Sequence, residues 1–134
     1  MISMTPKITL LFAALHALLM LALAARVAFH RHSQKVGLGD GGDKRLMQKI
    51  RVHANFVEYV PLALLLLALL ELSGLPAIWL WSLGGVLLFA RVLHVIGLSR
   101  RSGYSFGRLW GTLLTWVVLA TMAVAGLWLG LSTP

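Results

Sequence analysis

Three polar side chains at the start of a long apolar run have the types and the spacing of a binding site. They are Arg51, Asn55 and Glu58, and Tyr59 follows directly. At about 100° per residue, the three fall within an arc of roughly 60° on one helix face. A charge inside an apolar helix is costly, and it is rare without a partner and a function. This face is therefore the first candidate for chemistry in the chain.

Two further polar faces lie in the segments that follow. Arg91 and His94 share one helix face, and Arg108 shares another with Thr112. If the faces converge, they form a cationic pocket open to the cytoplasm, with Glu58 as its one buried carboxylate, and its chemistry is the binding of an anion. Arg108 comes at a predicted helix start, where a cation opposes the helix dipole, so we expect it to face an anion or a lipid phosphate.

Each of these residues also has a structural interpretation. Glu58 can form an ion pair with Arg51 or Arg91 that only fixes helix packing. Asn55 can be an interhelical hydrogen-bond clamp, and His94 a packed, neutral partner of Glu58 or Arg91. Arginines do not bind metals and the chain has no cysteine, so no metal site is expected.

The elements that position these residues are long and apolar. The chain has 134 residues, 59% of them hydrophobic, and a mean hydropathy of +0.86. This excludes an ordinary soluble domain and predicts an all-α, integral membrane four-helix bundle, with residues 1–134 as a single domain. The expected spanning helices cover about 8–29, 44–72, 76–98 and 106–131.

The basic residues predict how the bundle is oriented. Eleven of the twelve Lys and Arg residues flank the first and third connections, and only Lys7 lies near the opposite side. By the positive-inside rule, those connections are cytoplasmic and both termini lie on the non-cytoplasmic side. The net charge of +8 follows this topology, so we expect the lipid bilayer and no nucleic acid as a partner.

The polar pattern resembles the MAPEG family, the membrane-associated proteins in eicosanoid and glutathione metabolism. The resemblance rests on Arg51-x3-Asn55-x2-Glu58-Tyr59-x-Pro61, on Arg91-x2-His94 and on Arg108, and it extends from about Lys44 to Leu119. It is strongest to small bacterial members, which implies the bacterial inner membrane. It also implies a homotrimer that binds glutathione as co-substrate between neighbouring subunits near the cytoplasmic face. The implied glutathione contacts are Arg51, Asn55, Glu58, Tyr59, Arg91 and His94, and Arg108 would hold the sulfur as thiolate.

The implied activity is glutathione-dependent: transfer of the thiolate to a lipophilic electrophile, or reduction of a lipid peroxide. Arginines suit the two carboxylates of glutathione, Glu58 suits its ammonium, and a nearby guanidinium lowers a thiol pKa. Tyrosines that eicosanoid-forming members carry late in the third helix are replaced by Gly97 and Leu98. The resemblance therefore does not imply eicosanoid synthesis.

Two other functions are compatible with the sequence. A small proton-coupled multidrug exporter could use Glu58, although a coupling carboxylate should lack fixed cationic neighbours. A non-enzymatic membrane scaffold would use the polar faces only to hold its helices together. Stabilisation of the purified protein by glutathione distinguishes the enzyme from both.

Overall fold

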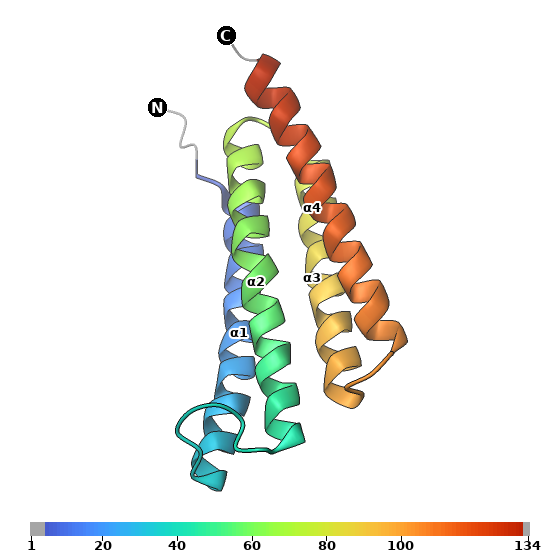
Figure 1. Ribbon diagram of the computed structural model, residues 1–134. Helices are drawn as coiled ribbons and strands as arrows, with labels where there is room; N and C mark the ends of the chain where they lie inside the picture. The colour runs from blue at the N-terminus through green and yellow to red at the C-terminus, as the bar shows by residue number, and fades with distance from the viewer. Residues whose placement is uncertain (1–4, 133–134) are drawn as a thin grey trace.

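The chain forms four long helices in a computed structural model that describes residues 5–132 (Figure 1). They are α1 (Lys7–Gln34), α2 (Lys44–Leu72), α3 (Ala77–Arg100) and α4 (Phe106–Ser132). By length and composition all four can cross a membrane, as the sequence predicts. The main difference from the expected bounds is in α1, which continues past Phe29 to Gln34.

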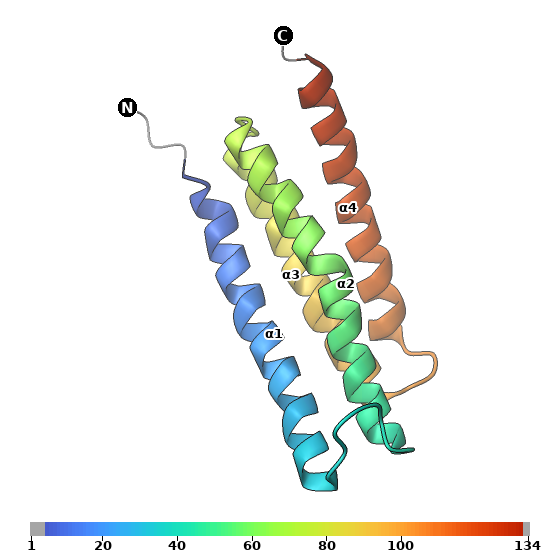
Figure 2. The same cartoon turned by 60° about the vertical axis from the view of Figure 1, so that its left-hand side comes forward.

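Successive helices run in opposite directions, so the connections alternate between the two ends of the bundle (Figures 1 and 2). The α1–α2 and α3–α4 connections, residues 35–43 and 101–105, lie at one end, which we call the basic end. The α2–α3 turn lies at the other end, where α1 begins and α4 finishes. Both groups of basic residues are therefore brought to the same end of the molecule.

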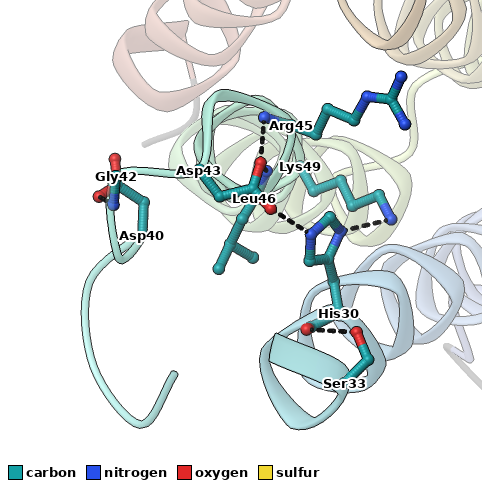
Figure 3. Close-up of polar contacts among 8 residues, drawn as sticks. All are labelled: His30, Ser33, Asp40, Gly42, Asp43, Arg45, Leu46 and Lys49. Carbon is teal, nitrogen blue, oxygen red and sulfur yellow. Dashed lines mark hydrogen bonds and ion pairs between the residues drawn. The ribbon is translucent and has the colours of Figure 1, made fainter. Parts of the chain in front are cut away.

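Asp43 fixes the start of α2 and ties it to α1 (Figure 3). Its carboxylate accepts the backbone N–H groups of Arg45 at 2.8 Å and Leu46 at 3.2 Å, and so forms the N-cap of α2. The His30 ring, on the last turns of α1, lies 2.7 Å from the same carboxylate, and Lys49 Nζ lies 3.0 Å from the other ring nitrogen. The hydrogen bond from His30, reinforced by the two N–H groups, holds the pKa of Asp43 below its ordinary value.

The opposite end of α1 has its own cap, which comes from α2. Pro6 precedes α1 and offers no side-chain cap. The Glu71 carboxylate accepts the N–H of Ile8 at 2.9 Å and of Thr9 at 2.7 Å instead. A carboxylate at a helix N-terminus also interacts favourably with the helix dipole.

Small residues let α3 and α4 approach closely. A Cβ on Gly111 of α4 would lie 2.6 Å from His94 Cβ and 2.7 Å from the Ala90 carbonyl oxygen of α3. A Cβ on Gly97 of α3 would lie 2.3 Å from the backbone nitrogen of Arg108. This is the small-residue packing typical of membrane helices, and it sets the distance between the polar faces of α3 and α4.

Candidate functional site

A cavity of about 650 Å³ opens at the basic end between α2 and the α3–α4 pair. Its volume lies within the range of about 300–1,000 Å³ that is typical of small-molecule sites. The sequence-predicted residues that line it are Arg51, Asn55, His94 and Arg108, from three different helices. The remaining lining residues are Asp40, Gly42, Lys44, Met47, Gln48, Leu98, Ser102 and Thr112.

The cavity wall is cationic. Lys44, Arg51 and Arg108 line it, and Asp40 is the one carboxylate among the lining residues. A low-dielectric cleft that carries one sign of charge raises the local concentration of ligands of the opposite sign. The wall therefore suits an anionic small molecule.

Arg91 lies directly behind this wall and is fully buried. Its Nη2 donates to Asn55 Oδ1 at 2.6 Å and lies 3.4 Å from His94 Nδ1. Its Nη1 donates to Thr115 Oγ1 of α4 at 3.4 Å. The guanidinium thus joins α2, α3 and α4 beneath the cavity, and Asn55 and His94 separate it from the space where a ligand would bind.

No carboxylate of the described residues lies within ion-pair distance of Arg91. The rings of Phe56 and Tyr59 lie 5.8 Å and 5.9 Å from its guanidinium carbon, so they contribute cation–π stabilisation. Its Nε has no hydrogen-bond partner within residues 5–132. A buried guanidinium without a counter-ion leaves an uncompensated positive charge next to the cavity.

Within the single chain, Glu58 is not the buried carboxylate of the pocket that the sequence predicts, and its place in an assembly stays a prediction. Its side chain is 52% exposed in the isolated chain, it does not line the cavity, and its ion-pair partner is Arg51, with Nη1 and Oε1 3.6 Å apart. Helix geometry explains the difference. Seven residues turn the helix by about 700°, so Arg51 and Glu58 lie within about 20° of each other, to one side of Asn55. Asn55 is turned toward Arg91 of α3, whereas Glu58, about two turns beyond Arg51, lies outside the cavity that Arg51 lines.

Tyr59 also lies outside the cavity lining. Its hydroxyl accepts a hydrogen bond from Trp116 Nε1 of α4 at 3.1 Å, and its ring faces the guanidinium of Arg91. Within one chain, Tyr59 therefore connects α2 to α4 rather than facing the cavity.

Arg108 is held at the mouth of the cavity by the connection that precedes α4. Its Nη1 donates to the carbonyl oxygens of Ser102 at 2.9 Å and Gly103 at 3.4 Å. Its backbone N–H donates to Ser105 Oγ at 3.2 Å, which caps the start of α4. The other guanidinium N–H groups of Arg108 make no hydrogen bond with the described part of the chain, so they are available to a ligand.

Gln48 and Lys44 complete the α2 side of the cavity, and the sequence analysis did not identify them. Gln48 Nε2 donates to the Leu98 carbonyl, which fixes α2 against the last turns of α3. A periodic signal was present: Lys44, Gln48, Arg51 and Asn55 follow one another at intervals of three or four residues on a single face. Their polarity near a helix start made them resemble ordinary interfacial residues.

The fold and the site together define a four-helix membrane bundle in which arginines converge on a cavity at one end. The sequence pattern of the MAPEG family matches residues 9–128, and the chain belongs to that family. The chain is also similar to the "Inner membrane protein YecN" of Escherichia coli strain K12 and of strain CFT073. Each is 35% identical over 127 residues, which cover 90% of this chain and 91% of the relative.

Proposed function

We propose that this protein is a glutathione-dependent enzyme of the bacterial inner membrane, which transfers the thiolate to a lipophilic electrophile or reduces a lipid peroxide with it. The observation that carries the proposal is the convergence of Arg51, Asn55, His94 and Arg108 on one cavity at the basic end. Glutathione is a small dicarboxylate with a thiol, and the cavity wall carries three cations and one carboxylate. The similarity to an inner membrane protein of Escherichia coli supports the location.

The residues divide into ligand contacts and positioning groups. Arg51 and Asn55 bind carboxylate oxygens of the tripeptide, and Arg108 faces its sulfur. Arg91 acts through Asn55 and His94: it fixes both side chains and adds positive potential beneath them. The thiol releases its proton as the thiolate forms, and the sulfur then bonds to the electrophilic carbon as the leaving group departs. In the second reaction the same thiolate attacks an oxygen of the peroxide, the O–O bond breaks, and the leaving alkoxide takes up a proton to become an alcohol. A second glutathione then displaces hydroxide from the oxidised sulfur, which gives glutathione disulfide and, with a proton, water.

A homotrimer completes the site in this proposal. The Arg51–Glu58 pair is half exposed on a helix that can span the membrane, and contact of charges with lipid is costly. A neighbouring subunit would cover this surface and place Glu58 near the ammonium of a bound glutathione. The alternative function, a proton-coupled exporter, requires a carboxylate without a cationic neighbour. Glu58 does not meet this requirement, because Arg51 Nη1 lies 3.6 Å from its Oε1.

The test is stabilisation of the detergent-purified protein by glutathione. We expect glutathione and its S-methyl derivative both to raise Tm, because the carboxylate contacts do not need the thiol. Arg51→Gln should abolish most of the rise, and Arg45→Gln, which removes a charge at the same end but outside the cavity lining, should keep it. If neither compound changes Tm, or if the two variants respond alike, the cavity is not a glutathione site.

A further inference from the structure

A second hollow lies at the basic end, on another side of the α3–α4 connection. It measures about 410 Å³ and shares no lining residue with the larger cavity. Gly97 and Gly107 belong to its lining, and there the two helices touch through their backbones: a Cβ on Gly97 would lie 2.8 Å from the Gly107 Cα. The crossing of α3 and α4 is therefore bare backbone, and larger side chains from both helices form a rim around it.

One part of this rim is cationic and unpaired. Arg100 and Arg101 line the hollow, and both are exposed. The ion pairs of the described residues are Arg51–Glu58 and His30–Asp43, and neither involves these arginines. Within residues 5–132, no side-chain hydrogen bond to either guanidinium is present. Two cationic side chains on the rim of one hollow, without an acceptor among the described residues, suit a phosphate group.

The other part of the rim is apolar and faces outward from the bundle. Ile96 is 44% exposed, Phe106 is 66% exposed, and Leu93 lies beside them. Leu93 and Arg100 are seven residues apart on α3, which is about 10 Å along the helix axis. Because α3 and α4 can both span a membrane, the apolar wall faces hydrocarbon while the arginines lie nearer the water.

We infer that this hollow binds one anionic phospholipid. The phosphate lies between Arg100 and Arg101, the Tyr104 hydroxyl reaches the polar headgroup, and one acyl chain covers Leu93, Ile96 and Phe106. The two unpaired cations select a lipid with net negative charge over a zwitterionic lipid. The apolar wall selects an amphiphile over free phosphate, since phosphate alone leaves that wall uncovered. This site is independent of the proposed glutathione cavity.

Trp110 reports occupancy of the hollow, because its ring centroid lies 6.0 Å from that of Phe106. The protein is reconstituted into phosphatidylcholine vesicles that contain phosphatidylglycerol, with bromine on the acyl chains of one lipid at a time. Bromine quenches nearby tryptophans, and the Trp110→Phe variant identifies the contribution of Trp110. We expect brominated phosphatidylglycerol to quench Trp110 at a clearly lower mole fraction than brominated phosphatidylcholine.

Two charge-matched double variants separate this site from general attraction to the basic end. Arg100→Gln/Arg101→Gln should raise the mole fraction of phosphatidylglycerol required by about fivefold for each arginine removed. Lys35→Gln/Arg45→Gln should leave it unchanged; Lys35 lines a different hollow in the α1–α2 connection. Equal quenching by the two lipids, equal shifts in the two variants, or displacement of the lipid by inorganic phosphate would each overturn the proposal.

Discussion

At the scale of single residues, Arg91 dominates the electrostatics of the bundle. It is fully buried, yet the groups that face it are an amide, an imidazole, a hydroxyl and two aromatic rings. Neutral dipoles stabilise a guanidinium without cancelling its charge. The positive potential therefore extends through Asn55 and His94 into the cavity, where an anion can provide the missing compensation. Arg91 therefore holds α2, α3 and α4 together and also makes the cavity more favourable for an anion.

Asn55→Ala should destabilise the protein by about 1.5–3 kcal/mol, because it removes the 2.6 Å hydrogen bond to a buried guanidinium. Neutral interhelical hydrogen bonds in membranes are typically worth only about 0.6 kcal/mol. The measurement is unfolding in mixed detergent. Ser82→Ala is the control, since Ser82 bonds only to its own helix on an exposed face. Equal stability of the two variants would mean that Arg91 does not depend on Asn55.

Arg108→Ala should weaken glutathione binding modestly but strongly lower the fraction of bound thiolate, because in the proposed complex the charge of Arg108 faces the sulfur. Thiolate is followed by its ultraviolet absorbance while bound glutathione is titrated across pH. In the parent protein the thiol should titrate below its unperturbed pKa of about 8.5, and in the variant it should return toward that value. If the thiol titrates identically in the parent protein and in the variant, Arg108 does not lower its pKa. Another group then does so, or the protein does not activate the thiol.

At the scale of elements, the close contact of α3 with α4 and the caps of α1 and α2 position the site. Sequence patterns predict the four helices well, since long apolar runs separated by glycine and charge have few alternatives. Four of the predicted site residues also line the cavity. Sequence patterns do not indicate that Glu58 lies outside the cavity of the single chain, because helical spacing shows which residues share a face but not which part of that face the next helix covers. Nor do they indicate that Glu71 caps α1, since that contact joins residues 62 and 63 positions apart.

Two glycine-to-alanine substitutions test the α3–α4 contact. Gly111→Ala should destabilise the bundle by about 1–3 kcal/mol, because its Cβ would meet His94 and the Ala90 carbonyl at 2.6–2.7 Å. It should also disturb ligand binding, since His94 lines the cavity. Gly126→Ala on the same helix has open space around the added atom. It should be neutral or stabilising by up to about 1 kcal/mol. Similar losses in both variants would argue against close packing at Gly111.

The Asp43 cap predicts how stability responds to acid. The pKa of Asp43 is lowered in the folded protein by the hydrogen bond from His30 and by the α2 N–H groups. The unfolded state therefore binds the proton more tightly, and the cap contributes fully above the unfolded pKa of about 3.9. Its contribution is lost as pH falls below that value, through the folded pKa. The Tm difference between the parent and Asp43→Ala should thus shrink in that range. Asp40→Ala, a carboxylate loss in the same connection, should not reproduce this pattern.

At the scale of the whole molecule, successive helices run in opposite directions. Both basic connections therefore lie at one end of the bundle, and the start of α1 and the end of α4 lie at the other (Figure 1). The asymmetry is what the positive-inside rule uses to orient a bundle. It also places the larger cavity and the smaller hollow on the same side of the membrane. A soluble co-substrate and a membrane lipid would therefore approach from the same face.

A reporter that is active only in the cytoplasm tests this orientation. Fused after Pro134, it should be inactive, because we expect the C-terminus on the non-cytoplasmic side. Inserted between Gly41 and Gly42 in the α1–α2 connection, it should be active. The glycines there adopt positive φ and belong to an exposed connection that tolerates insertion. The reverse pattern would invert the bundle and move the proposed site to the opposite face.

The cap that Glu71 provides has a consequence for how the chain is assembled during synthesis. The acceptor for the first N–H groups of α1 leaves the ribosome more than sixty residues after the donors. Until α2 has crossed the bilayer, those amides depend on water or on lipid headgroups, so α1 alone is an incomplete insertion unit. We therefore expect the helical hairpin of α1 and α2 to insert more stably than α1 alone. Nascent chains that end before Glu71 should remain with the insertion machinery longer than chains that include it.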